Sequence, residues 1–146
     1  MFNRPVREFR PYETACEISP DAKIAAIVDA FVRAPDLHHV CIVNEEGRLL
    51  GLLNRKRLFK SIFSHHIAAD SRISSLLQLH TAEISSDIMI TDIVTTTESE
   101  EIDAVIARMI EKNIREVPVM DENGSVIGFL TLLMLMKKWL SRREKG

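Results

Sequence analysis

The sequence has few of the features that mark secreted or disulfide-stabilised proteins. Among its 146 residues there are two cysteines, one tryptophan and one tyrosine. Two cysteines are too few for a disulfide framework, and they lack the spacing of a zinc site. Cys16 and Cys41 lie in apolar, strand-like stretches, so we expect two reduced, buried thiols. This cysteine usage predicts a cytoplasmic protein.

Long apolar runs and an excess of one charge are also missing. No run of 18 apolar residues is present, and residues 1–13 lack the apolar segment of a secretory signal. The 19 basic and 21 acidic residues give a net charge of −2. No strong electrostatic field would therefore attract nucleic acid or an anionic membrane. We expect neither of them to be a partner.

No catalytic motif is recognisable in the chain. It contains no G-x-S-x-G, no P-loop and no G-x-G-x-x-G. His38 and His39 would point to opposite faces of a strand, and His66 with Asp70 would offer a metal ion only two ligands. We therefore predict a protein that is not an enzyme, has no metal site and requires no cofactor.

What the sequence does contain is an internal repeat. Residues 40–58 read VCIVNEEGRLLGLLNRKRL, and residues 117–135 read VPVMDENGSVIGFLTLLML. An offset of 77 aligns two pairs of glycines and most of the apolar positions. Upstream, the apolar stripe of residues 24–31 matches that of residues 102–109 at an offset of 78. Two copies are too few for a solenoid, so we expect two small units that complete each other's core.

Each copy predicts the order strand, helix, strand, turn, strand, helix. The first helix of one copy is expected to start at Ser19-Pro20-Asp21, and that of the other at a Ser99 cap and to end near Lys112. Residues 1–14 predict an extended arm, and Asp70-Ser71 is a candidate cap for a connector helix. The remaining predicted elements are strands at residues 16–18, 40–43, 49–53, 94–97, 117–120 and 126–130, and helices at 55–63 and 131–143.

The second copy carries a resemblance to a known family. Its residues 113–124, NIREVPVMDENG, followed by IGFLT at 127–131, are similar to the CBS-domain pattern "girrlPVvDe.G.lvGivt". Residues 86–92, SDIMITD, resemble the lead-in that precedes the family's first strand. In the first copy, Cys41 replaces the usual proline and Asn44 the usual aspartate. The sequence thus resembles a CBS-domain pair, or Bateman module.

This resemblance implies an α/β (α+β) fold in which two tandem β-α-β-β-α units pack around a pseudo-twofold axis. The expected domains are an N-terminal arm (1–14), a first unit (15–66), a connector (67–86) and a second unit with the C-terminal helix (87–146). In many family members, clefts between the units bind adenine nucleotides or adenosine derivatives. Occupancy is then passed to a partner protein as a change of shape, and many such modules form homodimers.

Nucleotide-binding members hold ribose and phosphate with a segment G-h-h-(T/S)-x-x-D. Its hydroxyl can bond phosphate, and its carboxylate can accept both ribose hydroxyls. In the second copy Thr131 matches the hydroxyl, but Met134 stands at the carboxylate position. In the first copy Asn54 and Arg57 stand at these two positions. Neither copy retains the ribose-reading carboxylate.

Five further residues are placed near a ligand by the resemblance. The strand edge at Thr95 and Thr96 would offer backbone groups to an adenine ring, and Val117 and Pro118 would lie against the same ligand. Arg115 stands where the family often has a basic residue near the phosphate. The preference of threonine for strands explains Thr95 and Thr96 equally well, and an isolated arginine is more often a surface residue.

The triplet Arg55-Lys56-Arg57 has two interpretations. As a functional site, Arg55 and Arg57 would hold an anionic group of the ligand, because arginine suits bidentate contacts with phosphate. As a structural feature, the triplet is a solvated helix face, which is what most runs of charge are. Three positive charges at a helix start oppose the helix dipole, and a bound anion would relieve this cost.

Two functional hypotheses follow from these observations. The first is a regulatory module that senses AMP, ADP, ATP or another adenosine derivative. It would act as a homodimer on an effector protein in trans, since no effector domain is recognisable in the sequence. The second is a dimerisation or scaffold module that needs no ligand, which the missing carboxylates favour.

Overall fold

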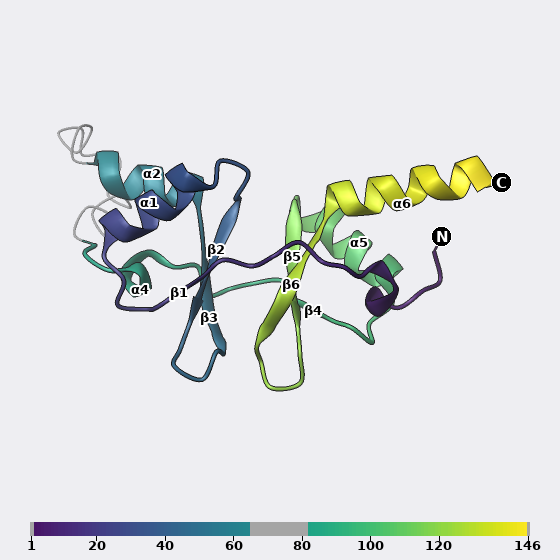
Figure 1. Ribbon diagram of the computed structural model, residues 1–146, viewed down its shortest axis with the longest axis horizontal. Helices are drawn as coiled ribbons and strands as arrows, with labels where there is room; N and C mark the ends of the chain where they lie inside the picture. Colours follow the sequence, from purple (N-terminus) through teal and green to yellow (C-terminus); the bar gives the residue numbers. More distant parts are fainter. Residues whose placement is uncertain (1, 65–81, 146) are drawn as a thin grey trace. The chain divides into compact units, whose positions relative to one another are not determined.

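The computed structural model describes residues 2–64 and 82–145 and shows two compact units (Figure 1). The first-repeat unit comprises Cys16–Ile93, and the second-repeat unit comprises Met1–Ala15 together with Val94–Gly146. The N-terminal segment is therefore grouped with the second repeat, and residues 84–93 are grouped with the first. The predicted connector helix after Asp70 lies outside the described residues.

In its described residues, the first-repeat unit has a three-stranded sheet, two longer helices and one short helix. Its sheet has the order β1-β2-β3, with β1 parallel to β2 and β2 antiparallel to β3. Its core gathers buried side chains from both helices and the central strand, Ile27, Phe31, Val40, Ile42 and Leu58 among them. The elements are β1 (Glu17–Ile18), α1 (Ile24–Arg33), β2 (His39–Val43), β3 (Leu49–Asn54), α2 (Arg55–Phe63) and α4 (Ser85–Ile88).

The second-repeat unit repeats this plan. Its sheet has the order β4-β5-β6 with the same strand directions. The pair Val40↔Leu53 recurs as Val117↔Leu130, and both hairpins have a register shift one residue before the strand β2 or β5 ends. The elements are η1 (Val6–Phe9), β4 (Thr96–Thr97), α5 (Ile102–Lys112), β5 (Glu116–Met120), β6 (Val126–Thr131) and α6 (Leu132–Lys145). The predicted fold class and the internal repeat are confirmed.

The two hairpin turns are built alike because each begins with an Asx side chain. Asn44 Oδ1 accepts hydrogen bonds from the backbone N–H groups two and four residues ahead, at 3.0 and 2.9 Å. Asp121 Oδ1 does the same at 2.9 Å in both cases. Gly47 and Gly124 have φ of 81° and 83°, a conformation that glycine adopts without steric cost.

The predicted caps of the two first helices lie too early, by four residues for Ser19 and by two for Ser99. Helix α1 begins at Ile24, and α5 begins at Ile102. The Ser19 hydroxyl instead donates to Asp21, within a turn closed by Ala22 N–H and Ser19 C=O at 3.2 Å. Ser99 likewise lies in a turn that precedes the helix. Serine and aspartate satisfy backbone groups in turns as well as in caps, so the local pattern did not separate the two.

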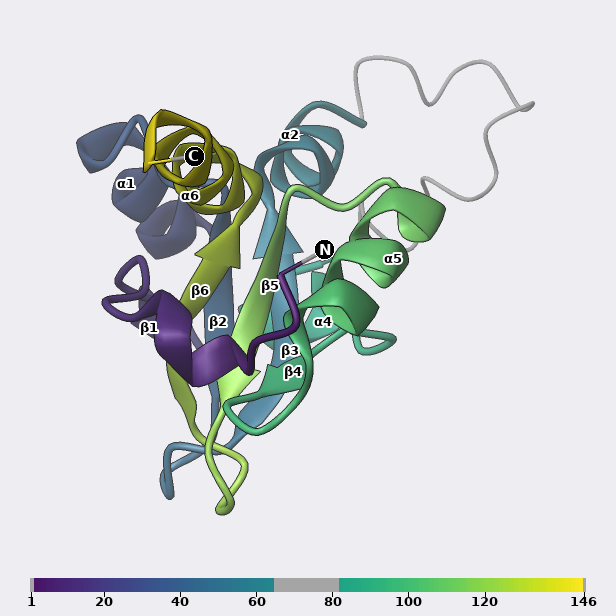
Figure 2. The same cartoon turned by 90° about the vertical axis from the view of Figure 1, so that its right-hand side faces the viewer.

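The expectation that residues 1–14 form only an extended arm is also wrong. Phe2, Val6 and Phe9 are buried in the core of the second-repeat unit, beside Ile102 and Val105. The segment runs beside the start of α5 (Figure 1 and Figure 2), where Val6 N–H donates to Glu100 C=O at 2.9 Å. Val6 and Phe9 are three positions apart, which places them on one side of the 3-10 helix η1, and the Phe2 ring packs edge-on against that of Phe9 with the centroids 5.7 Å apart. Charged residues between them hid this pattern.

Each unit is completed by the segment that precedes the other repeat. We call residues 2–15 the first lead segment and residues 82–93 the second lead segment. Glu13 and Phe129 exchange two backbone hydrogen bonds of 3.0 and 2.8 Å. Ile90 and Leu52 exchange two of 2.7 and 2.9 Å, and both residues lie 77 positions from their counterparts in the second-repeat unit. Two glycines allow this approach, Gly128 beside the first lead segment and Gly51 beside the second.

Alanine at the two glycines is expected to have unequal effects. A Cβ at Gly128 would lie 2.6 Å from Tyr12 Cβ and 2.9 Å from Glu13 O, and neither atom can move without its backbone. A Cβ at Gly51 would meet chiefly Met89 Sδ at 2.7 Å, at the flexible end of a side chain. We expect Gly128→Ala to lower the free energy of unfolding by about 2–3 kcal/mol and Gly51→Ala by about 1 kcal/mol. Urea denaturation of both variants checks this order; equal losses would contradict it.

Candidate functional site

In each repeat, the residue at the family's hydroxyl position caps the helix that follows: Asn54 caps α2, and Thr131 caps α6. Asn54 Oδ1 accepts a hydrogen bond of 2.8 Å from the Arg57 N–H at the start of α2. Thr131 Oγ1 accepts one of 3.2 Å from the Met134 N–H at the start of α6. Both side chains are partly exposed. Each side-chain oxygen therefore supports the helix that follows it, and a ligand would share it with that role.

Thr95 and Thr96, which the resemblance places beside an adenine ring, are hydrogen-bonded to the ion pair of Glu100 and Arg108. Thr96 is buried, and its hydroxyl donates to Glu100 Oε1 at 2.6 Å. Arg108 donates to both carboxylate oxygens of Glu100, at 2.6 and 2.7 Å, and to the Thr95 carbonyl at 3.0 Å. The Thr96 hydroxyl and the Thr95 carbonyl are thus already bonded within the protein.

The other candidates of the second repeat lie on or beside strand β5. Val117 and Pro118 are buried, whereas Arg115 is exposed. The backbone carbonyl of Arg115 accepts a 3.0 Å hydrogen bond from Leu132 N–H, which ties the start of β5 to the start of α6. In the sheet register Glu116 faces Thr131. Thr131 and Arg115 therefore lie near the same end of the β5–β6 hairpin.

Two carboxylates beside strand β4 are stabilised in their ionised form. The Arg108 guanidinium, helped by the Thr96 hydroxyl, holds the pKa of Glu100 below its ordinary value of 4.5. Arg10, helped by the Tyr12 hydroxyl at 2.8 Å, does the same for the pKa of Glu98. Burial and the hydrogen bond to Glu98 raise the pKa of Tyr12 to about 12. These contacts fix the first lead segment and α5 to the loop after β4.

We expect stability to fall in acid because of these two glutamates. A carboxylate with a lowered pKa in the folded state stabilises the fold above its ordinary value of 4.5 and loses that contribution as the pH falls through its folded pKa. Glu100→Gln should therefore lower stability at pH 7 by up to about 1 kcal/mol and flatten the decline below pH 4.5. Thermal melts between pH 3 and 7 test this, with the exposed Glu111→Gln as control. If the melting temperature of Glu100→Gln falls with decreasing pH as steeply as that of the wild type, the prediction is wrong.

The basic triplet is divided between two structural roles. Arg55 is exposed, and its Nε donates to the Leu37 carbonyl at 2.8 Å while its Nη2 donates to the Pro35 carbonyl. Arg57 is partly buried, and its Nε donates to the carbonyl of Ile88 in α4. Lys56 is exposed. Arg55 therefore fixes the α1–β2 connection, and Arg57 fixes the second lead segment.

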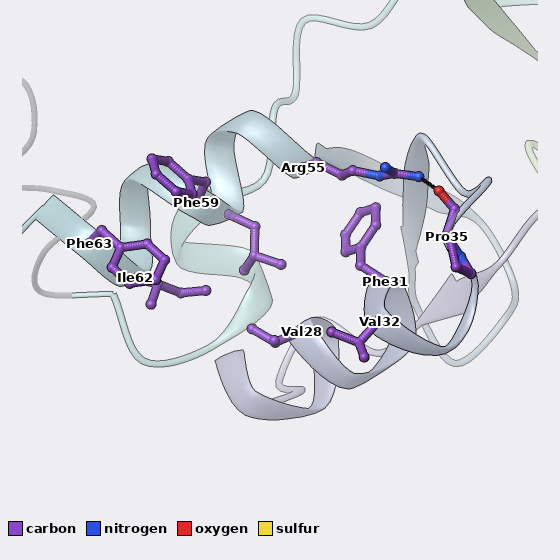
Figure 3. A pocket seen from close by; sticks show the side chains of 9 residues that line it. Val28, Phe31, Val32, Pro35, Arg55, Phe59, Ile62 and Phe63 are labelled. Atoms are coloured by element: carbon purple, nitrogen blue, oxygen red, sulfur yellow. Dashed lines mark hydrogen bonds between the residues drawn. The ribbon is translucent and has the colours of Figure 1, made fainter.

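The predicted ligand residues fall into two groups that belong to different units. Asn54, Arg55 and Arg57 lie in the first-repeat unit, and the residues from β4, β5 and β6 lie in the second. One hollow of about 630 Å³ in the first-repeat unit is lined by Glu17, Asp21 and Glu45 and would repel a phosphate. A second, of about 350 Å³, lies between α1 and α2 and has Arg55 at its rim (Figure 3).

Two further kinds of feature are absent from the described residues. Residues 2–64 and 82–145 hold no group of three or more His, Cys, Asp or Glu side chains that could bind a metal ion. His66 and Asp70, the pair considered from the sequence, lie outside this part of the chain. Within the same described ranges, no helix has the length and apolar character needed to cross a bilayer.

The architecture defines a class: two β-α-β-β-α units of the same topology, each with a helix-capping polar residue at the end of its last strand. The family model of the CBS domain matches residues 17–64 and 84–141. The chain therefore belongs to the CBS domain family, and its tandem copies form a CBS-domain pair, as the sequence motifs predict.

Solved CBS-domain pairs have the same fold. The pair from protein MJ0100, in complex with 5′-methylthioadenosine and S-adenosyl-L-methionine, is 20% identical with a TM-score of 0.70, covering 92% of this chain and 98% of that one. CBSX2 in complex with AMP is 17% identical with a TM-score of 0.73, over 96% and 98%. The CBS protein TM0935 of Thermotoga maritima is 23% identical with a TM-score of 0.73, over 93% and 94%.

Curated relatives are longer than this chain. The protein MK0525 of Methanopyrus kandleri is 28% identical over 122 residues, which are 84% of this chain and 52% of that protein. A homoserine O-acetyltransferase of Methanococcus vannielii is 27% identical over 96 residues, 66% of this chain and 17% of the enzyme. The chain thus spans about half of the first relative and about a sixth of the second.

Proposed function

We propose that this chain is a regulatory module that binds an adenosine-derived ligand and signals its presence to an effector protein in the cytoplasm. The family membership supports a regulatory role. The single observation that carries the ligand class is the fold shared with pairs solved in complex with AMP and with S-adenosyl-L-methionine. Occupancy would reach the effector as a change of shape, because a ligand shifts the pair toward the conformation that it binds better.

We place the ligand against the second-repeat unit. Thr131 retains the hydroxyl, and Val117-Pro118 retains the family's strand motif. The backbone at Thr95 and Thr96 would meet the adenine ring, since the Thr96 hydroxyl is held by Glu100. Arg115 is exposed and lies near Thr131, at one end of the β5–β6 hairpin. It would contact the phosphate of a ligand that carries one. Without a carboxylate at position 134, affinity is expected to be modest.

The first test is a thermal-shift screen of the whole chain. The ligands are AMP, ADP, ATP, S-adenosylmethionine, 5′-methylthioadenosine, NAD and cyclic dinucleotides. A ligand present at 100 times its dissociation constant adds about 2.7 kcal/mol to the free energy of unfolding, which raises the melting temperature visibly. If no compound in this set raises it, the adenosine-ligand proposal fails.

Variants of Thr131 are expected to separate ligand contact from helix capping. Thr131→Ala removes both, and the lost cap alone costs about 1 kcal/mol of stability. Thr131→Asn keeps a capping side chain, as Asn54 does in the first repeat, but removes the hydroxyl. Thr131→Ser keeps both. Calorimetry measures the affinity of each variant for the compound that the screen identifies. We expect this affinity to be about tenfold weaker for Thr131→Asn and unchanged for Thr131→Ser. Unchanged affinity for Thr131→Asn would show that the ligand lies elsewhere.

The second candidate function is a ligand-independent scaffold. The observation that favours it is a set of exposed apolar side chains on α6, Leu132, Leu133, Met136 and Leu140. A second copy of the chain would remove them from water. A dimer found by light scattering, together with no response in the ligand screen, would favour this function over ligand sensing.

A further inference from the structure

An acidic side chain lies directly across the sheet from Thr131, against which we place the ligand. Glu116 and Thr131 are partners in the antiparallel pair of β5 and β6. Side chains of such partners point to the same face of a sheet, with their Cβ atoms about 5 Å apart. Their neighbours Val117 and Leu130 belong to the core, so Glu116 and Thr131 lie on the opposite face. A ligand that contacts the Thr131 hydroxyl therefore approaches the Glu116 carboxylate.

Little water is available to screen the charge of Glu116. The residue is only 8% exposed, whereas the neighbouring Arg115 is exposed. Water and salt screen the field of an exposed charge, and they screen that of a buried charge much less. Glu116 can keep its contacts within the protein and still oppose an incoming anion, because its charge acts through space. We therefore expect Glu116 to influence a ligand at Thr131 more strongly than Arg115 does.

The first repeat has a different residue at the equivalent position. There His39 is the partner of Asn54 in the pair of β2 and β3, in the same register 77 residues earlier. The hairpin of this fold therefore forms without a carboxylate at the start of its first strand. Glutamate is also uncommon in strands, so strand preference does not explain Glu116. The acid distinguishes the second repeat from the first, at the end of the hairpin where the helix-capping residue lies.

We propose that Glu116 makes the second-repeat site selective for adenosine derivatives that carry no phosphate. A phosphate monoester has a charge of about −1.5 to −2 at pH 7, and beside Thr131 it would meet a second negative charge. A neutral group on the 5′ carbon avoids this repulsion, and a cationic group is attracted instead. This inference rests on the proposed function, because it specifies the ligand of the same site.

The test compares three nucleosides that differ only in the charge on the 5′ carbon. They are 5′-amino-5′-deoxyadenosine, which is cationic, adenosine, which is neutral, and AMP, which is anionic. Calorimetry with the full wild-type chain at low ionic strength measures their affinities. We expect adenosine to bind at least about tenfold more tightly than AMP, and the amino compound to bind at least as tightly as adenosine. AMP that binds as tightly as adenosine would overturn the proposal.

Two variants assign the selectivity to Glu116. Glu116→Gln keeps the size of the side chain but removes its charge, and it should reduce the preference for adenosine over AMP to about twofold or less. Glu122→Gln removes the same charge at an exposed position of the hairpin turn, beyond the other end of β5, and should leave the preference unchanged. A preference that survives Glu116→Gln would overturn the proposal.

The same measurements separate this inference from the proposed function. If none of the three compounds binds to the wild type or to Glu116→Gln, the proposed function fails and the selectivity fails with it. If all three bind with equal affinity, only the selectivity is overturned. The order of the three affinities in the wild type decides the question even if Glu116→Gln does not fold.

Discussion

A fragment of residues 1–68 is expected to show no cooperative unfolding transition. It contains the whole first repeat, but it lacks the second lead segment. Ile88 of that segment is fully buried in the first-repeat core, and Met89 packs against the same cluster. Without them, Leu52 also loses both backbone hydrogen bonds to Ile90. The fragment additionally carries Phe2, Val6 and Phe9 without the core that buries them, which favours aggregation.

The matched control is the fragment of residues 16–93. It is only slightly longer, but it contains every member of the first-repeat core and leaves out the first lead segment. We expect this fragment to melt cooperatively at a temperature below that of the full chain, because small domains are marginally stable. Circular dichroism melts with light scattering compare the two fragments. A cooperative monomeric melt of residues 1–68 would show that the lead segments are not required.

Placing a charge in the first lead segment is expected to have the largest effect of any single substitution considered. Val6 has no exposed surface and contributes to the core of the second-repeat unit. Val6→Asp would place a carboxylate among apolar side chains without a partner and would lower the free energy of unfolding by about 4 kcal/mol or more. Thr14→Asp, at an exposed position of the same segment, should change it by less than about 0.5 kcal/mol.

Urea denaturation of the full chain measures both substitutions. If Val6→Asp is tolerated as well as Thr14→Asp, the N-terminal segment is not part of the folded core. A result in which only Val6→Asp destabilises would instead establish that residues 2–15 are structural.

Most of the fold could be predicted from the sequence because its signals are local. The helix at residues 55–63 and the hairpin strands follow from apolar periodicity and from turns that contain an Asx residue and glycine. The lead segments could not be predicted, because their partners lie far away in the sequence. The residues near Phe9 do not indicate that it will be buried beside α5. Those near Ile88 do not indicate that it will be buried beside β3. Two sequence signals were available, the spacing of Phe2, Val6 and Phe9 and the resemblance of residues 86–92 to the family's lead-in, but neither identifies the partner strand.

The candidate site was harder to predict for a related reason. A motif identifies the positions that a family uses, but not the other bonds that a residue makes. Arg57 was expected either to face a ligand or to be solvated, and instead it donates to the Ile88 carbonyl. No sequence motif indicates the Glu100–Arg108 ion pair, which holds the Thr96 hydroxyl. A glutamate and an arginine eight residues apart are common on helices, so only the structure distinguishes this pair.

The exchange of lead segments also bears on how the chain is made. Residues 2–15 leave the ribosome before both repeats, yet the strand that Glu13 pairs with is completed only at Thr131. At usual rates of synthesis this delay is roughly ten seconds. During that time Phe2, Val6 and Phe9 have no core to join, while the first repeat acquires its own second lead segment at residue 93. Residues 2–15 are thus made before both repeats but reach their final contacts only after the second repeat is made, and chaperones could bind them in the interval.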